Sequence, residues 1–274
     1  MKATGKVLDL PQEEYRADEG VSRSELHVLA RSPMHYKYAQ EHQREDTPAL
    51  LFGSALHCYV LEPERFADEY IVVGKIDRRT TEGKAQVTEI EASGKLPVSE
   101  DDYDTIKAMS ESIRANPYAV RLLKGEHEVS YFATDPTTGI RIKCRPDCRV
   151  DLGGVSVIVD LKTTRSASTE SFSRACLDYG YDLQAAMYKQ IVDEVEGKPH
   201  RFVFIAVEKD PPYACNVLEA DELMLRKGAD DLRGYLMTLA ECRRTGNWYG
   251  YNGESGKPNI IGLPAWLAKT YEGG

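Results

Sequence analysis

Between Ile140 and Thr164 the chain reads IRIKCRPDCRVDLGGVSVIVDLKTT, a pattern that predicts two β-strands joined by a turn at Gly153-Gly154. The first strand carries Asp147 near its middle, and the second strand ends near Asp160 and Lys162. Residues two apart on an extended strand point to the same face, so Asp160 and Lys162 share one face. If the two strands pair, Asp147 and Asp160 converge. Carboxylates that meet in this way favour a divalent cation such as Mg²⁺, which prefers hard oxygen ligands.

The rest of the chain predicts helices around these strands. Apolar residues recur at helical spacing in residues 49–61, 183–195 and 221–244, whereas 201–207 is a continuous apolar run typical of a buried strand. An earlier helix begins near Ser22, where Ser-x-x-Glu fits a capping box. We therefore expect an α/β fold, with a central mixed β-sheet flanked by helices and a helical N-terminal portion.

The chain of 274 residues is expected to form one domain after a short arm. Residues 1–20 are polar and irregular, which indicates a flexible N-terminal arm. Residues 21–274 form the single domain, which has three predicted parts. These are a mostly helical part at 21–125, an α/β core at 126–244 and an irregular C-terminal tail at 245–274.

Composition excludes several classes of protein. Hydrophobic residues make up 42% of the chain and charged residues 29%, which is typical of globular proteins. The sequence has no apolar run of about 20 residues, so we expect no membrane partner, and the N-terminus has no secretory signal, so we expect a cytoplasmic protein. The net charge of −9 argues against a wholly basic surface but allows a local DNA-binding patch.

Four short motifs occur in a specific order along the chain. Pro146-Asp147 precedes Asp160-Leu161-Lys162, a helix then carries Gln184-x-x-x-Tyr188, and Gly53-Ser-Ala-Leu-His57 lies upstream. This order resembles the PD-(D/E)xK nuclease superfamily, and within it the RecB-type branch. From about residue 21 to residue 271 the chain is most similar to the nuclease domains of the RecE (exonuclease VIII) type. The segments that carry this similarity are LFGSALHCYVLEPERF, GIRIKCRPD and DLKTT. The iron–sulfur cluster of some RecB-type nucleases is not expected, because a late group of three cysteines is missing.

The motifs and this resemblance together identify the expected site residues. The predicted catalytic residues are Lys162, Asp160, Asp147, Glu128, Gln184 and Tyr188. The predicted metal ligands are His57, Asp147, Asp160 and the backbone carbonyl of Leu161. The predicted DNA contacts are Arg145, Thr163, Thr164 and Arg165. The metal is expected to be Mg²⁺, with Mn²⁺ as a possible substitute.

Each of these residues also has an ordinary structural interpretation. Lys162 can form a simple ion pair, and a lone histidine such as His57 is more often a boundary residue than a ligand. Glu128 can be an exposed strand residue. Gln184 and Tyr188 can be a solvated side chain and a packed one. A basic cluster at Lys75, Arg78, Arg79 and Lys84 can contact DNA or lie on a solvated loop.

The resemblance implies a Mg²⁺-dependent exodeoxyribonuclease that degrades linear double-stranded DNA. It further implies attack on the 5′ strand to leave 3′ single-stranded tails for recombination, a ring-shaped homotetramer, and a single-strand annealing recombinase as a partner. Two alternatives remain open at this point. One is another RecB-type nuclease, either an endonuclease or an end trimmer, and the other is an inactive member of the fold that only binds DNA.

Overall fold

The structure is a computed structural model. It describes residues 4–42, 47–76, 79–264 and 267–268. Arg78 of the expected basic cluster and the chain ends 1–3 and 269–274 lie outside the described residues. In the described part of the chain, no helix is both long and apolar enough to cross a membrane.

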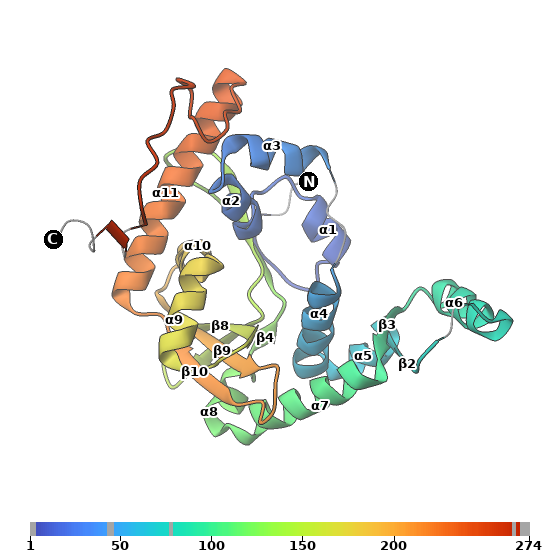
Figure 1. The fold of residues 1–274 in the computed structure, drawn as a ribbon. Helices are drawn as coiled ribbons and strands as arrows, with labels where there is room; N and C mark the ends of the chain where they lie inside the picture. Colours follow the sequence, from blue (N-terminus) through green and yellow to red (C-terminus); the bar gives the residue numbers. More distant parts are fainter. Residues whose placement is uncertain (1–3, 43–46, 77–78, 265–266, 269–274) are drawn as a thin grey trace.

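Helices dominate up to residue 122, and all strands of the central sheet follow it (Figure 1). The helices are α1 (Gln12–Ala17), α2 (Arg23–Leu29), α3 (Pro33–Glu41), α4 (Pro48–Leu61), α5 (Pro63–Glu69), α6 (Thr81–Ser93), α7 (Glu100–Ala115), α8 (Pro117–Leu122), α9 (Thr169–Asp178), α10 (Tyr181–Glu196) and α11 (Glu222–Thr245). The strands are β1 (Gly5–Val7), β2 (Tyr70–Val73), β3 (Leu96–Ser99), β4 (Glu126–His127), β5 (Ser130–Thr134), β6 (Arg141–Cys144), β7 (Cys148–Leu152), β8 (Val155–Thr164), β9 (His200–Glu208) and β10 (Cys215–Glu219).

The central sheet has five strands in the order β10-β9-β8-β7-β4. Strands β8 and β9 are parallel, whereas the other neighbours are antiparallel, so the predicted mixed α/β fold is confirmed. The predicted turn between β7 and β8 is also present. Gly153 and Gly154 both adopt positive φ, at 58° and 87°, which glycine allows and which matches the tight turn of a twisted hairpin.

One prediction about the strands was wrong. Asp147 does not lie in the middle of a strand, because the chain leaves β6 after Cys144 and enters β7 at Cys148. Strand β6 belongs to a separate three-stranded sheet, ordered β1-β5-β6, whereas β7 belongs to the central sheet. Pro146 has no N–H to donate to a ladder, so it suits a break between strands. The break leaves Asp147 free of strand pairing.

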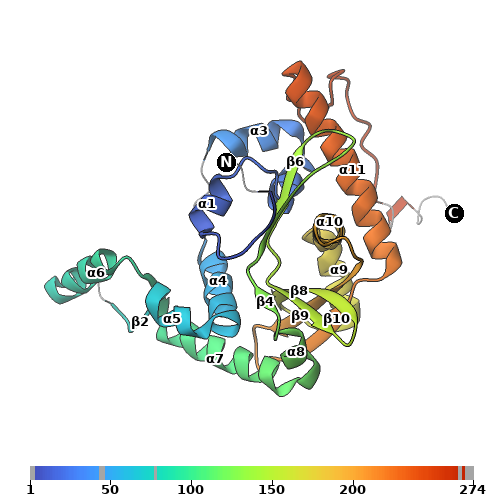
Figure 2. The ribbon, with the colours of Figure 1, turned by 180° about the vertical axis from the view of Figure 1, so that it is seen from behind.

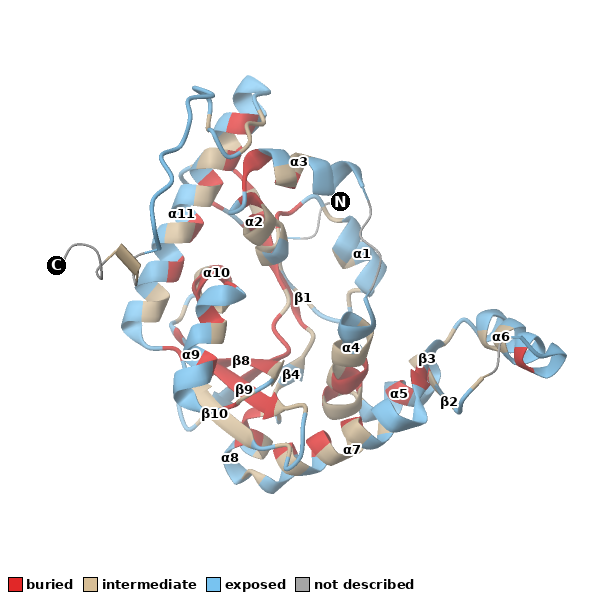
Figure 3. Cartoon of the chain, in the orientation of Figure 1, coloured by how far each residue is buried: buried red, intermediate tan, exposed pale blue. Residues whose placement is uncertain are grey.

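Strand β8 separates two hydrophobic cores. Val157, Val159 and Leu161 pack on one side of the sheet, against a core that includes residues of α4, α7 and α8. Ile158 points to the other side, where the core includes residues of α2, α9, α10 and α11. Because side chains alternate along a strand, Asp160 belongs to the side of Ile158 and α10. Figure 3 shows the buried residues concentrated along the strands and on the inner faces of the helices.

Helix α6 projects from the body of the molecule together with the parallel pair β2 and β3 (Figures 1 and 2). This part of the chain carries Lys84, one member of the basic cluster that was expected either to contact DNA or to lie on a solvated loop. Gly83 is the one buried residue among the described residues of α6, and Lys84 is exposed. The arm lies far from the central sheet, so the fold itself does not bring it to the strands that carry the predicted acids.

The prediction of a flexible arm at residues 1–20 was wrong for the described residues 4–20. Strand β1 pairs with β5, so this end of the chain is part of a sheet. Basic side chains of β6 hold the segment that follows. Arg141 donates to the Asp18 carboxylate at 3.0 and 2.9 Å. Lys143, which is 4% exposed, donates to the carbonyls of Tyr15 and Asp18 at 2.7 and 2.6 Å.

We expect the Lys143→Met substitution to lower the free energy of unfolding by about 1–3 kcal/mol, because partly buried carbonyl groups lose their donor. Urea unfolding measures this change, and chymotrypsin cleavage near Tyr15 reports whether the N-terminal segment loosens first. The control is Lys84→Met on the exposed face of α6, which should change stability by less than about 0.5 kcal/mol. Equal stability and equal cleavage in the two variants would show that the hydrogen bonds of Lys143 do not hold the N-terminal segment in place.

Candidate active site

Three side chains from distant parts of the chain converge beside the central sheet. His57 comes from α4, Glu128 from the link between β4 and β5, and Asp147 from the break between β6 and β7. One ligand atom from each of the three lies within 4.8 Å of the other two. The His57 Nδ1 atom is 3.3 Å from Asp147 Oδ1. The structure therefore brings together three of the residues that the sequence singled out.

The backbone fixes Asp147 and Glu128 next to β8. Asp147 Oδ2 accepts a hydrogen bond from the Leu161 N–H at 2.5 Å, and the Glu128 N–H donates to the Asp147 carbonyl at 3.3 Å. Glu128 has a φ of +50°, in the left-handed region that non-glycine residues rarely occupy. Such backbone strain is found mainly where the surrounding structure imposes it, often at functional sites.

A second group of polar residues borders the first one. Asp160 is 2% exposed, and its Oδ2 atom lies 2.5 Å from the Lys162 Nζ atom. The buried amide of Gln184 on α10 donates to Asp160 Oδ1. Asp160 thus contacts the lysine on its own strand and the glutamine on the facing helix. Asp160 is not one of the three converging ligands, but the charge of Asp147 raises its pKa and the charge of His57 lowers it.

The charges of this site depend strongly on one another. Burial raises the pKa of Asp147, but the charge and hydrogen bond of His57 and the charge of Lys162 outweigh burial and leave this pKa below its ordinary value. Burial lowers the pKa of His57, but Asp147 and Glu128 outweigh burial and raise it to about 9. The imidazole therefore carries a proton that partly offsets the carboxylates when no other cation does so.

Two of the acids at this site have pKa values above their ordinary values. Burial and the charge of Asp147 raise the pKa of Glu128 to about 8. Burial is also the main reason why the pKa of Asp160 is raised, and Asp147 adds to it although Lys162 opposes the shift. An imidazole nitrogen and two carboxylates this close together suit a divalent cation, which relieves the repulsion. The donor set of His57, Glu128 and Asp147 therefore fits a metal ion.

The remaining predicted site residues occupy different surroundings. Tyr188 packs its ring against Phe202, and burial raises the pKa of its hydroxyl well above the ordinary value. The side chain of Leu161 lies in the hydrophobic core. The Thr164 hydroxyl donates to the carbonyl of Ser166 at 3.0 Å, as in an ordinary turn. Thr163 is half-buried, and the Arg165 side chain is exposed.

Arg145, a predicted DNA contact, is engaged by the N-terminal segment. Its guanidinium donates to Gln12 Oε1, the Leu10 carbonyl and Ser130 Oγ at 2.5, 2.8 and 2.9 Å, and it lies 4.3 Å from the centre of the Tyr15 ring. Sequence reasoning missed the contacts of Arg145 with the N-terminal segment because they join residues 130 or more positions apart.

Sequence reasoning also missed Arg23 of α2. Its Nη2 atom donates to Gln184 Oε1 at 3.0 Å. The predicted capping interaction, in which the Ser22 N–H donates to Glu25 at 2.8 Å, is the sequence signal that places Arg23 at the first helical position. No pattern in the sequence links this arginine to a helix that begins at residue 181.

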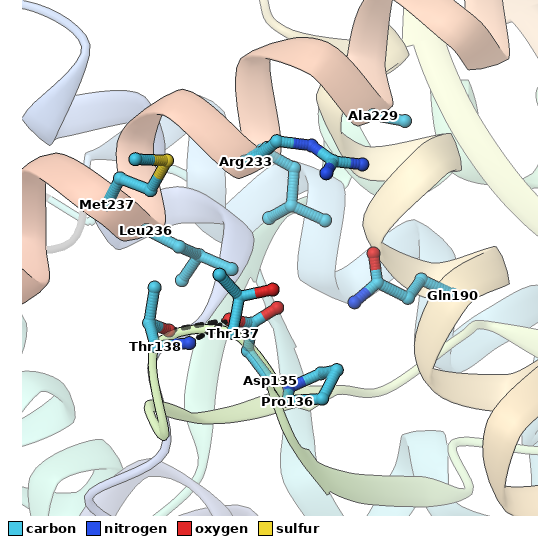
Figure 4. Close-up of a pocket in the computed structure, with 10 residues that line it drawn as sticks. Asp135, Pro136, Thr137, Thr138, Gln190, Ala229, Arg233, Leu236 and Met237 are labelled. Carbon is cyan, nitrogen blue, oxygen red and sulfur yellow. Dashed lines mark hydrogen bonds between the residues drawn. The ribbon is translucent and has the colours of Figure 1, made fainter.

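A separate pocket of about 150 Å³ lies between α10, α11 and the turn after β5 (Figure 4). Asp135 lines it, but its carboxylate already accepts from the N–H and the hydroxyl of Thr138 at 2.8 and 2.6 Å. Arg233 lines the pocket from α11, and Gln190 lines it from α10. None of the predicted site residues lines this pocket.

Comparisons with known proteins agree with the α/β fold. A family model described as "PDDEXK-like domain of unknown function (DUF3799)" matches residues 22–259. The crystal structure of a "putative exonuclease" from Eubacterium rectale has a TM-score of 0.63 and 19% sequence identity. That alignment covers 96% of this chain and 99% of the other. A crystal structure of SSO0001 has a TM-score of only 0.31 at 16% identity, with 70% and 85% of the two chains covered. No curated protein matches the chain.

The raised pKa of Glu128 predicts how stability depends on pH. The pKa is about 8 in the folded protein against an ordinary value of 4.5, so ionisation of Glu128 opposes folding. The free energy of unfolding of metal-free protein is therefore expected to fall between about pH 5 and about pH 8, and Glu128→Gln is expected to remove part of this fall. Denaturant unfolding in the presence of a chelator measures the effect. Glu111→Gln, at an exposed position of α7, serves as the control and should follow the wild type. Identical pH profiles for Glu128→Gln and the wild type would contradict the prediction.

Proposed function

The chain belongs to the PDDEXK-like family, and on this premise we propose that it is a Mg²⁺-dependent exonuclease that degrades linear double-stranded DNA. The observation that carries the proposal is the convergence of His57, Glu128 and Asp147 next to the Asp160–Lys162 pair. An inactive DNA-binding member of the fold would have no need to keep these mutually repelling acids, of which Asp147 and Asp160 are buried, close together.

Each side chain has a proposed role. His57, Asp147 and Asp160 would hold Mg²⁺ together with the Leu161 carbonyl, and Glu128 would complete the acidic ligands. Mn²⁺ would substitute, because it accepts the same oxygen and imidazole donors. The bound ion would supply an activated water and stabilise the charge on the phosphate that is cleaved.

Lys162 and α10 act on the reacting groups in this proposal. The Lys162 ammonium would orient the attacking water or stabilise the charge that develops on the phosphate, which is the kind of interaction that lowers a barrier. Gln184 donates to Asp160 and so holds this carboxylate in place. Tyr188, one turn further along α10, would support the same carboxylates or contact phosphate. The DNA backbone would be contacted by Thr163, Thr164 and Arg165.

The finer parts of the proposal rest on the resemblance of the motifs to RecE-type nucleases. They are attack on the 5′ strand, 3′ single-stranded tails for recombination, a ring-shaped homotetramer, cytoplasmic location and a single-strand annealing recombinase as partner. The likeness to the Eubacterium rectale protein, which is described as a "putative exonuclease" and aligns over 99% of its length, supports only the exonuclease part of the proposal.

Linear and covalently closed circular DNA of the same sequence test the proposed end requirement. We expect Mg²⁺-dependent release of acid-soluble nucleotides from the linear duplex but not from the circle, because an exonuclease needs a free end. Both substrates must be compared at one salt concentration, since phosphate contacts make activity salt-dependent. Asp160→Ala should show only background release, whereas Asp230→Ala, at an exposed position of α11, should retain full activity. Equal digestion of the circle would favour an endonuclease. Full activity of Asp160→Ala would overturn the site itself.

A further inference from the structure

The side-chain amide of Gln184 connects the Asp160 carboxylate to an arginine of α2. Gln184 is 3% exposed, so its two polar ends depend on protein partners. The Nε2 end donates to Asp160 Oδ1, and the Oε1 end accepts from Arg23 Nη2 at 3.0 Å. These contacts form a chain of two hydrogen bonds from Arg23 through the amide to the acid.

A glutamine amide has two ends of nearly equal shape and opposite hydrogen-bonding character. Only the NH₂ end can donate to the Asp160 carboxylate, whereas the carbonyl end would face it with like partial charge. Arginine has donors and no acceptor, so Arg23 can hold only the carbonyl end of Gln184. The presence of Arg23 therefore favours the one amide orientation that presents N–H groups to Asp160.

Arg23 is itself held in place from three directions. It is the first residue of α2, directly after the Ser22–Glu25 capping interaction. Its Nη1 atom donates to the Tyr179 carbonyl at 3.2 Å, and its guanidinium lies 5.9 Å from the centre of the Tyr181 ring. A planar guanidinium can satisfy two acceptors and a ring face together, whereas a lysine ammonium has no such fork. The geometry thus explains why an arginine occupies this position.

Arg23 also lies on the side of the site where Lys162 is found. The Lys162 Nζ atom is 4.7 Å from the centre of the same Tyr181 ring. Both partners of Asp160, the lysine and the glutamine, are therefore linked to one small group made of Arg23 and Tyr181. A displaced Gln184 would leave one Asp160 oxygen without this donor, and the carboxylate would lose a fixed direction.

From these contacts we infer that Arg23 is a positioning residue, which sets the amide orientation of Gln184 and through it the direction of the Asp160 carboxylate. The inference deepens the proposed nuclease function and rests on it for its catalytic consequence. The contact between Arg23 and Gln184 itself does not depend on catalysis, so it can be tested without any DNA or metal.

The first test follows the Gln184 amide directly by NMR of protein labelled with ¹⁵N only at glutamine. The sequence has six glutamines, so the spectrum has six side-chain NH₂ pairs, and Gln184→Ala identifies the pair of interest. We expect Arg23→Ala to move this pair away from its wild-type position. Arg31→Ala, which removes an exposed arginine just after α2, should leave it unchanged. An unmoved Gln184 pair in Arg23→Ala would overturn the inference, whatever the activity.

The second test is a double-mutant cycle on the rate of DNA cleavage. Loss of a residue that orients a metal-binding group costs about 10–100-fold in activity, and we expect such a loss in kcat for Arg23→Ala and for Gln184→Ala. The double variant should match Gln184→Ala within about twofold, because Arg23 has no amide left to orient. Equal losses from Arg23→Ala in both backgrounds, carried mainly by KM, would instead make Arg23 a direct DNA contact and contradict a positioning role.

Arg23→Lys covers the case in which the alanine variant does not fold. It keeps the charge but not the fork, so we expect a displaced Gln184 pair and a kcat between those of the wild type and Arg23→Ala. A lysine variant with the wild-type amide position and kcat would show that charge alone suffices and would overturn the inference. If the wild type cleaves no DNA with any divalent metal, the proposed function fails, but the Gln184 signals still decide whether Arg23 orients the amide.

Discussion

The closeness of His57, Glu128 and Asp147 is the constraint on which the rest of the site depends. Their ligand atoms lie within 4.8 Å of one another, in surroundings that keep Asp147 almost fully buried. Two like charges 4 Å apart repel by about 4 kcal/mol in a medium of effective dielectric constant near 20. A protonated His57 or a bound cation can offset this repulsion, whereas burial, together with the charge of Asp147, raises the pKa of Glu128.

The two hydrophobic cores hold these groups together against their repulsion. Strand β8 contributes Val157, Val159 and Leu161 to one core, and its alternate positions turn Asp160 toward α10. The same strand supplies the Leu161 N–H that binds Asp147. Burial of one face of β8 thus positions the acid on its other face and the hydrogen bond at its edge. The position of the site therefore follows from β8, whose side chains pack into the hydrophobic cores on both sides of the central sheet.

Much of this arrangement could be predicted from local patterns. Strand β8, the glycine turn before it and helix α10 follow from the apolar pattern, the Gly-Gly pair and helical spacing. The order of the motifs singled out the acids, Lys162 and Gln184, which lie close together in the structure. Three features could not be predicted. They are the break between strands at Asp147, the hydrogen bonds of Lys143 to the N-terminal segment and the contact of Arg23 with Gln184. Each of these depends on residues that meet only after the chain has folded, and no short-range spacing encodes them.

The central claim is that His57, Glu128 and Asp147 form a metal site, and the thermal stability of the protein in Mn²⁺ tests it most directly. A ligand that binds only the folded state at about 100 times its Kd stabilises that state by about 2.7 kcal/mol. The melting temperature of the wild type should therefore rise with Mn²⁺ concentration, whereas that of Asp147→Ala should stay constant over the same range. An equal rise in both proteins, or no rise in the wild type, would contradict the account.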